Sequence, residues 1–217
     1  MENSPIKEAT PSNVYTDFVD SGSRVPKPEE VYILPVSFVK CMREIAPKLK
    51  ASGAWWAFGG DLAEKFAGVT VIPKEVEILT NMDGIDKIHA ALSEYKPTPV
   101  TLFERKLERE AEIDSKSYPV LARSHRITLE VRGVPVVVDG EYHMKVGDWD
   151  WGDSLEFKPS VVNVVGIELP VMPVRLSGEI YITLGWLDRS QMVSDAISHA
   201  HHAMGQYGNE LGGYQEG

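Results

Sequence analysis

Two glutamates separated by one residue form the stretch of chain best suited to metal chemistry. Glu75 and Glu77 lie in KEVEIL, where polar and apolar residues alternate, and this alternation predicts a strand over residues 75–80. Because successive side chains of a strand point to opposite faces, both carboxylates project to the same side. Such a pair can hold a hard divalent cation such as Mg²⁺, although a solvated strand face explains the same pattern without a ligand.

A glycine turn precedes this acid pair. The apolar run 54–58 predicts a buried strand, and residues 61–67 predict a short helix that begins directly after Gly59 and Gly60. Two glycines let the backbone approach a ligand closely, and the unpaired N–H groups at a helix start suit phosphate. A phosphate cradle beside two carboxylates is what metal-assisted phosphoryl transfer needs, whereas a tight turn without a ligand is the alternative.

This order of motifs resembles the nucleotidyltransferase superfamily, which has the DNA polymerase beta-like fold. In that family a strand runs into Gly-Gly or Gly-Ser and a short helix, the next strand carries an acid-x-acid pair, and a later strand supplies a third carboxylate. The resemblance extends over residues 33–200. It implies that Gly59, Gly60 and Lys74 bind a nucleotide.

The resemblance also implies a catalytic metal site. Glu75 and Glu77 match the acid pair, and Asp139 at the end of VPVVVD matches the third carboxylate, with Glu130 as a less favoured choice. These three carboxylates would be catalytic and would hold Mg²⁺ or Mn²⁺ for a nucleoside triphosphate. The implied activity is transfer of a nucleoside monophosphate to a hydroxyl of an unidentified acceptor.

The chain departs from the family pattern at several of these positions. Small members carry Asp where this chain has Glu75 and Glu77, and the longer side chain would shift a bound metal, which transfer chemistry tolerates poorly. Asp61 places a negative charge directly after the glycines, and VTVIPK offers Lys74 where the family often has Arg. These departures predict an altered site and leave two further interpretations open. One is a catalytically inactive nucleotidyltransferase fold that serves as a binding or partner module, and the other is an unrelated α/β domain.

Hydrophobic periodicity predicts the elements around the site. Apolar steps of three and four predict a helix over residues 35–51, and further helices are expected over 83–95, 173–186 and 190–204. Strands are expected over residues 126–131, 134–139 and 161–165. The order predicts an α+β fold with a mixed β-sheet, helices packed on one side and a small C-terminal helical appendage, in which Pro173, Arg189 and Asp195 match the family. The expected divisions are a mobile tail (1–28), the core (29–170), the C-terminal helices (171–204) and a second mobile tail (205–217).

Several other residues have side chains that could bind a ligand or react. Residues 101–116 carry many charges of both signs and are expected to form an exposed helix or a mobile insertion. Arg123, His125 and Arg126 form a basic cluster that suits either substrate phosphate or solvent. A weak metal-binding pair (His199, His202), two tryptophans that stack on a base or pack (Trp149, Trp151) and an unreactive thiol (Cys41) complete the set.

Composition excludes several classes of protein. The 217 residues include 22 Lys and Arg against 32 Asp and Glu, a net charge of −10, which argues against a general nucleic-acid coat but not against one small anionic ligand. One cysteine excludes an internal disulfide and favours a reducing, cytoplasmic setting. The longest apolar stretch is interrupted by polar residues and prolines, and the N-terminus does not resemble a signal peptide, so no membrane association is expected.

Overall fold

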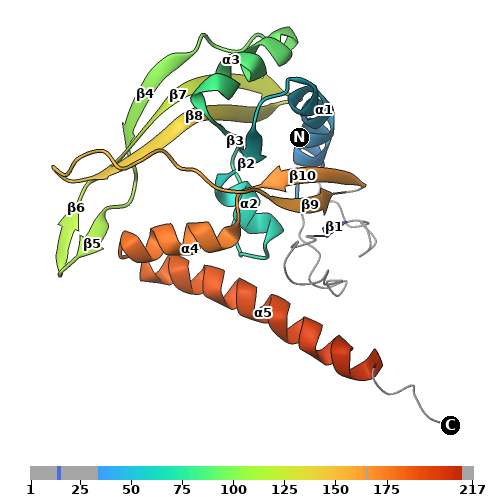
Figure 1. The fold of residues 1–217 in the computed structure, drawn as a ribbon, viewed down its shortest axis with the longest axis vertical. Coiled ribbons are helices and arrows are strands. Elements are labelled where there is room, and N and C mark those ends of the chain that lie inside the picture. Colours follow the sequence, from blue (N-terminus) through green and yellow to red (C-terminus); the bar gives the residue numbers. More distant parts are fainter. Residues whose placement is uncertain (1–13, 16–33, 165, 212–217) are drawn as a thin grey trace.

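The computed structural model describes residues 14–15, 34–164 and 166–211, with side chains described from residue 34 to residue 199. Within these residues the chain forms an α+β fold with a mixed sheet of eight strands in the order β1-β9-β10-β2-β3-β8-β7-β4 and a separate β5–β6 hairpin (Figure 1). The strands are β1 (Val14–Tyr15), β2 (Trp56–Phe58), β3 (Val76–Thr80), β4 (Thr101–Lys106), β5 (Ala111–Ile113), β6 (Lys116–Tyr118), β7 (Val120–Val131), β8 (Val134–Val146), β9 (Ser160–Val164) and β10 (Ile167–Val171). The helices are α1 (Val36–Ala51), α2 (Gly60–Phe66), α3 (Met82–Ala91), the 3₁₀ turn η3 (Ser93–Tyr95), α4 (Val174–Thr183) and α5 (Leu187–Leu211).

Helices α1 and α3 cover one face of the sheet. The apolar stripe predicted for α1 is buried, with Met42, Ile45 and Leu49 at most 1% exposed, and the helix continues through Pro47. These side chains pack against Ile78 of β3 and against the inward-facing residues of β7 and β8 in one hydrophobic cluster. Since Glu77 alternates with Ile78, its side chain lies on the opposite side, which we call the Glu77 face.

Strand register brings the predicted acids to neighbouring strands. Strand β3 pairs with β2 on one side in antiparallel fashion and with β8 on the other in parallel fashion. In the second pairing Glu77 lies opposite Val137, and Leu79 lies opposite Asp139. Asp139, the third predicted carboxylate, therefore lies on the neighbouring strand β8, two residues beyond Val137, which is opposite Glu77.

The prediction for residues 101–116 is wrong, because the segment is neither a helix nor an unstructured insertion. It forms the edge strand β4, paired with β7, and then most of the β5–β6 hairpin. Charged side chains suit an exposed edge strand, since they oppose pairing with another sheet. One buried residue of the hairpin, Ala111, packs with Val120, Leu184 and Trp186, a contact that the surrounding charges conceal in the sequence.

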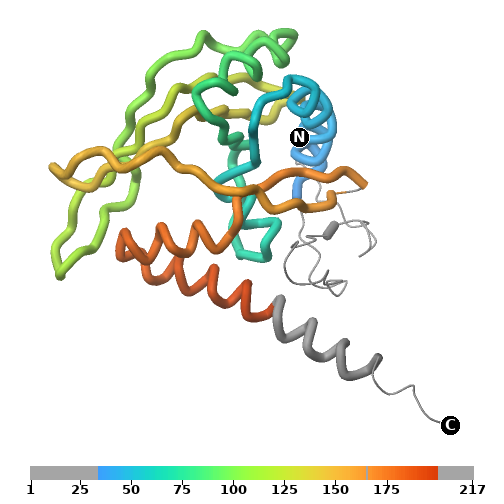
Figure 2. The backbone as a smooth tube through the Cα atoms, in the orientation of Figure 1, coloured from blue at the N-terminus to red at the C-terminus, as the bar shows by residue number. Residues whose placement is uncertain are grey.

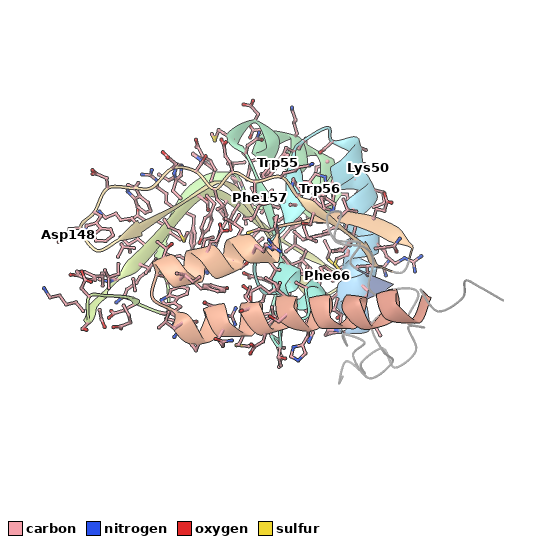
Figure 3. All side chains as sticks on the ribbon, turned by 60° about the horizontal axis from the view of Figure 1, so that its bottom comes forward. Lys50, Trp55, Trp56, Phe66, Asp148 and Phe157 are labelled. Carbon is pink, nitrogen blue, oxygen red and sulfur yellow. The ribbon has the colours of Figure 1, made fainter. Side chains whose placement is uncertain are left out.

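Two predicted strands are longer in the structure than expected. Strand β7 begins at Val120, and β8 continues past Asp139 to Val146, with an irregularity in their pairing between Arg123 and His125. The following segment returns over β2, where Phe157 packs edge-on against Trp55 with ring centroids 5.2 Å apart (Figure 3). Strand β10 was not anticipated, because Pro170 interrupts its pattern.

The C-terminal helices lie at the opposite end of the molecule from α1 and α3 (Figure 1). They break at Gly185, which has φ +70°, so α5 begins at Leu187 rather than at Ser190. The β5–β6 hairpin approaches this break, and Glu112 N donates to Leu184 O over 2.9 Å (Figure 2). Helix α5 extends to Leu211, and the rest of the predicted C-terminal tail lies outside the described residues. The predicted N-terminal tail also lies outside the described residues, except for β1. None of the described helices is long and apolar enough to cross a membrane.

Candidate functional site

The Gly59-Gly60 turn lies directly against the acid pair. Gly59 N donates to the backbone oxygen of Glu77 over 3.0 Å, which ties the turn to β3. Gly60 has φ +55°, and a Cβ at this position would lie 2.5 Å from Glu77 Oε2. Glycine is therefore required at residue 60 for its backbone conformation and for the space that the Glu77 carboxylate occupies.

Asp139 lies on the neighbouring strand, and its carboxylate is fully engaged with protein donors. Its Oδ1 accepts hydrogen bonds from Ser124 Oγ over 2.6 Å and from Arg126 Nε over 2.7 Å, and its Oδ2 accepts one from an Arg126 terminal nitrogen over 2.8 Å. Asp139 is 1% exposed, and the Arg126 side chain is 11% exposed. The arrangement is a buried, two-pronged ion pair, which is the geometry that makes arginine–carboxylate contacts strong.

The carboxylates on this face influence one another electrostatically. Burial first, and then the negative charges of Asp139 and Glu75, raise the pKa of Glu77 to about 7, against the opposing effect of Arg105 and Arg126. Burial would lower the pKa of Arg126, but its hydrogen bonds with Asp139 and the nearby carboxylate charges raise it above its ordinary value. Three carboxylates and one central guanidinium therefore share one electrostatic environment.

The residues predicted as metal ligands are gathered but are not arranged as a cation site. Among the residues that the structure describes, no group of three or more His, Cys, Asp or Glu side chains is placed to hold a metal ion. The physical reason lies at Asp139, because a carboxylate that accepts three hydrogen bonds has little capacity left for a cation. Glu130, the other choice for third ligand, is exposed and lies opposite Pro135, four residues along β7 from Arg126. Lys74 is exposed just before β3.

A second group of charged residues, missed by sequence reasoning, lies on the other side of the glycine turn. An Arg189 terminal nitrogen donates to Asp61 Oδ1 over 2.9 Å and to Glu64 Oε2 over 2.8 Å. Tyr181 OH donates to Glu64 Oε1, and Glu64 is 1% exposed. Burial raises the pKa of Glu64 despite these two partners. The Asp61 charge that conflicts with phosphate binding is thus paired with α5, and the only signal in the sequence was the matched position of Arg189.

The remaining candidates lie away from the Glu77 face. The guanidinium of Arg123 lies over Trp151, 4.4 Å from the ring centroid, which joins two residues that sequence reasoning had treated separately. His199 Nδ1 lies 2.8 Å from the backbone oxygen of Asp195, and His202 lies outside the described side chains. Burial raises the pKa of the Cys41 thiol to about 12, so this cysteine is not a nucleophile.

Structural comparison identifies the fold. A proposed nucleotidyltransferase from Thermotoga maritima superposes on 78% of this chain and 98% of its own, with a TM-score of 0.56 and 20% sequence identity. The antibiotic-resistance factor ANT(2'')-Ia, in complex with adenylyl-2''-tobramycin, covers 81% of this chain and 99% of its own at 8% identity and a TM-score of 0.42. Neither a protein-family model nor a curated protein sequence matches the chain.

Proposed function

We propose that the chain, which has a nucleotidyltransferase fold, acts as a binding or partner module that does not carry out metal-dependent nucleotidyl transfer. The observation that supports this proposal is the pairing of Asp139 with Arg126 and Ser124, which engages both oxygens of the third acid. Two longer acids at Glu75 and Glu77 support it as well, because transfer depends on placement of the reacting atoms to within about an ångström.

Charge supports the same proposal. A nucleoside triphosphate is itself strongly anionic, and the Glu77 face offers it three carboxylates against the guanidinium groups of Arg105 and Arg126. Without a cation between them, like charges brought close together repel each other. A triphosphate is therefore not expected to bind here unless a metal binds first.

One observation favours the competing function, which is Mg²⁺- or Mn²⁺-dependent transfer of a nucleoside monophosphate. The pKa of Glu77 is raised partly by the charges of Asp139 and Glu75, so the three acids are close enough to repel one another. A divalent cation would relieve that repulsion. For transfer, Arg126 would first have to release Asp139.

The two functions predict opposite results with nucleotide and metal. Purified protein is incubated with each of four α-³²P-labelled nucleoside triphosphates and Mg²⁺ or Mn²⁺, with the protein itself and total RNA as acceptors. Nucleotide binding is followed in parallel by calorimetry. We expect no transferred label and no heat of binding in any combination.

The matched variants are Glu77→Gln, Asp139→Asn and, as control, Glu130→Gln, which removes a carboxylate from the exposed part of β7. Metal-dependent transfer that is lost in the first two variants and retained in the third would establish the enzyme and overturn the module. Transfer that survives all three variants would point to a contaminating activity.

A further inference from the structure

Arg123 and Arg126 belong to one basic cluster in the sequence but project to opposite faces of β7. Arg126 reaches Asp139 on the Glu77 face, and because side chains alternate along a strand, Arg123 projects to the face that α1 and α3 cover. Helix α3 covers that face as far as Gly140, where a Cβ would lie 3.1 Å from the Cβ of Ile85. Strands β4, β7 and β8 continue past α3, and Arg123 lies on this continuation (Figure 1).

Strand register brings further basic side chains to the same part of the sheet. Leu121, two residues before Arg123, lies opposite Lys145 of β8 and Lys106 of β4. Residues directly opposite one another in a sheet share a face, so the three cations project to one side. We call the surface formed by Arg123, Lys145, Lys106 and Trp151 the ribbon face.

An aromatic ring, rather than a carboxylate, holds two of these cations. The guanidinium of Arg123 lies 4.4 Å from the ring centroid of Trp151, and Lys145 Nζ lies 6.0 Å from it. Neither side chain forms a hydrogen bond or an ion pair with any residue that the structure describes. This is unexpected in a chain with 32 Asp and Glu against 22 Lys and Arg. The ring fixes the guanidinium and leaves its N–H donors free for an anion.

Acidic side chains near the ribbon face limit the kind of anion that it suits. Glu104 lies directly opposite Arg123 on β4 without an ion pair between them, Glu110 pairs with Lys106, and residues 148–150 add exposed carboxylates in the turn after β8. A single small anion gains little at a surface of mixed charge. A partner with repeated negative charges and flat groups that stack gains more, because it uses the cations and the ring together.

We propose that the ribbon face binds a single-stranded nucleic acid. Arg123 and Lys145 would each contact a backbone phosphate, and unpaired bases would stack on Trp151 and on the guanidinium plane of Arg123. An open sheet face with its cations spread over three strands suits an extended polymer better than one phosphate group. The inference goes beyond the proposed function, since this surface lies on the other side of the sheet from the Glu77 face.

The test is the fluorescence anisotropy of a labelled oligouridine of about 12 nucleotides, a length within the range of known single-strand sites. The full chain is titrated at 50–200 mM KCl, and we expect a Kd below about 100 μM at the lowest salt. Arg123→Gln and Lys145→Gln should each weaken binding by ~5-fold or more. Each should also reduce the slope of log affinity against log salt by ~0.7, the value for one phosphate contact with a single strand.

Variants of the aromatic ring test stacking separately from charge. Trp151→Leu removes the ring and should weaken binding by ~5-fold or more, the low end for loss of a stacked aromatic residue. The salt slope should stay close to that of the wild type, because no charge is removed. Trp151→Phe keeps a ring and should retain most of the affinity. Equal losses in the leucine and phenylalanine variants would refute stacking on residue 151.

Two further variants supply a control and a change of opposite sign. Arg175→Gln removes an exposed charge from α4, away from the ribbon, and should leave affinity within ~2-fold of the wild type. Glu104→Gln removes the carboxylate opposite Arg123 and should tighten binding. Circular dichroism and urea unfolding show which variants are folded. If the Arg123 or Trp151 variants are not, Glu104→Gln still decides, because unchanged or weaker binding would contradict the proposal.

The remaining outcomes separate this partner from others. No anisotropy change with 100 μM wild-type protein, or equal losses in Arg123→Gln and Arg175→Gln, would overturn the proposal. So would competition by oligoglutamate or by a duplex as strong as that by unlabelled oligouridine, since an acidic protein or a charge-only contact would then explain binding. None of these results bears on the proposed function, which the transfer assay tests at the Glu77 face.

Discussion

Two buried carboxylates lie on either side of the Gly59-Gly60 turn, and they are satisfied in the same way by different parts of the chain. Asp139 and Glu64 are each 1% exposed, and each is held by one arginine and one hydroxyl group. Asp139 takes both partners from the neighbouring strand β7. Glu64 takes both of its partners, Tyr181 and Arg189, from the C-terminal helices.

The difference between them concerns distance along the chain. The Asp139–Arg126 pair spans 13 residues of a hairpin, whereas the Glu64–Arg189 pair spans 125 residues and joins the core to α5. The first pair sets the electrostatics of the Glu77 face, and the second fixes the C-terminal helices to α2. The helices that the sequence suggested as an appendage are therefore hydrogen-bonded to α2, the helix that follows Gly59.

The largest expected effect is on stability when Arg126 is replaced. Arg126→Met leaves Asp139 buried without its counter-ion, and breaking a buried ion pair costs about 3–5 kcal/mol. Urea unfolding at pH 8 measures the loss. Arg105→Met, which removes an exposed charge from the same face, should cost less than about 1 kcal/mol. Equal losses in the two variants would contradict a specific role for the buried pair.

A smaller loss is expected at the second pair. Arg189→Met leaves Glu64 buried with Tyr181 as its remaining donor, and hydrogen bonds to charged groups contribute about 1.5–3 kcal/mol. The loss is smaller than for Arg126 because the Arg189 side chain is 26% exposed.

The neighbouring ion pair provides the control for this second variant. Arg109 pairs with Asp188, the residue next to Arg189, but both side chains of that pair are exposed. Arg109→Met should therefore cost under about 1 kcal/mol in the same urea experiment. A loss as large as that of Arg189→Met would mean that the segment between β4 and β5, rather than Glu64, holds the C-terminal helices.

Glu77 differs from both buried acids because burial and like charges leave it with a pKa of about 7. A carboxyl whose pKa is raised in the folded state binds its proton more tightly there, so it destabilises the fold as pH rises from about 5 to 8. Glu77→Gln should remove this penalty and be about 3 kcal/mol more stable than the wild type at pH 8, with a gain of less than about 1 kcal/mol at pH 5. Chemical denaturation at the two pH values measures the difference, and a gain that is equal at both would refute the electrostatic cause.

The smallest effects are expected from the two hydroxyl groups. Ser124→Ala and Tyr181→Phe each remove one donor from a buried carboxylate and leave its arginine in place. Each should cost about 1–2 kcal/mol in thermal or urea unfolding. If either variant lost as much stability as the corresponding arginine variant, the hydroxyl rather than the arginine would be the main partner of that acid.

The sequence predicted what depends on short-range periodicity. Alternation placed Glu77 on one face of its strand, the Gly59-Gly60 turn marked the junction with a short helix, and Asp139 was expected at the end of a later strand. The pairing of Asp139 with Arg126 was not anticipated, although both residues lie in the predicted hairpin, because the choice between a metal ligand and an ion-pair partner depends on strand register. A one-residue shift would place them on opposite faces.

What the sequence did not predict depends on contacts between distant segments. Nothing near Glu64 in the sequence indicates a partner 125 residues away. The β5–β6 hairpin was missed because Ala111 is one small apolar residue among charges, and it is buried only by contact with Trp186 and Leu184. Both errors share a cause, which is that burial created by the C-terminal helices leaves no periodic pattern in the segments that they cover.

The most direct test of the account is a crystal structure of the protein grown with Mn²⁺ and a non-hydrolysable nucleoside triphosphate, with diffraction data recorded at the manganese absorption edge. The account predicts no anomalous peak on the Glu77 face and an intact ion pair between Arg126 and Asp139. A manganese peak bound by Glu75, Glu77 and Asp139, with Arg126 turned away and a triphosphate against Gly59 and Gly60, would contradict it.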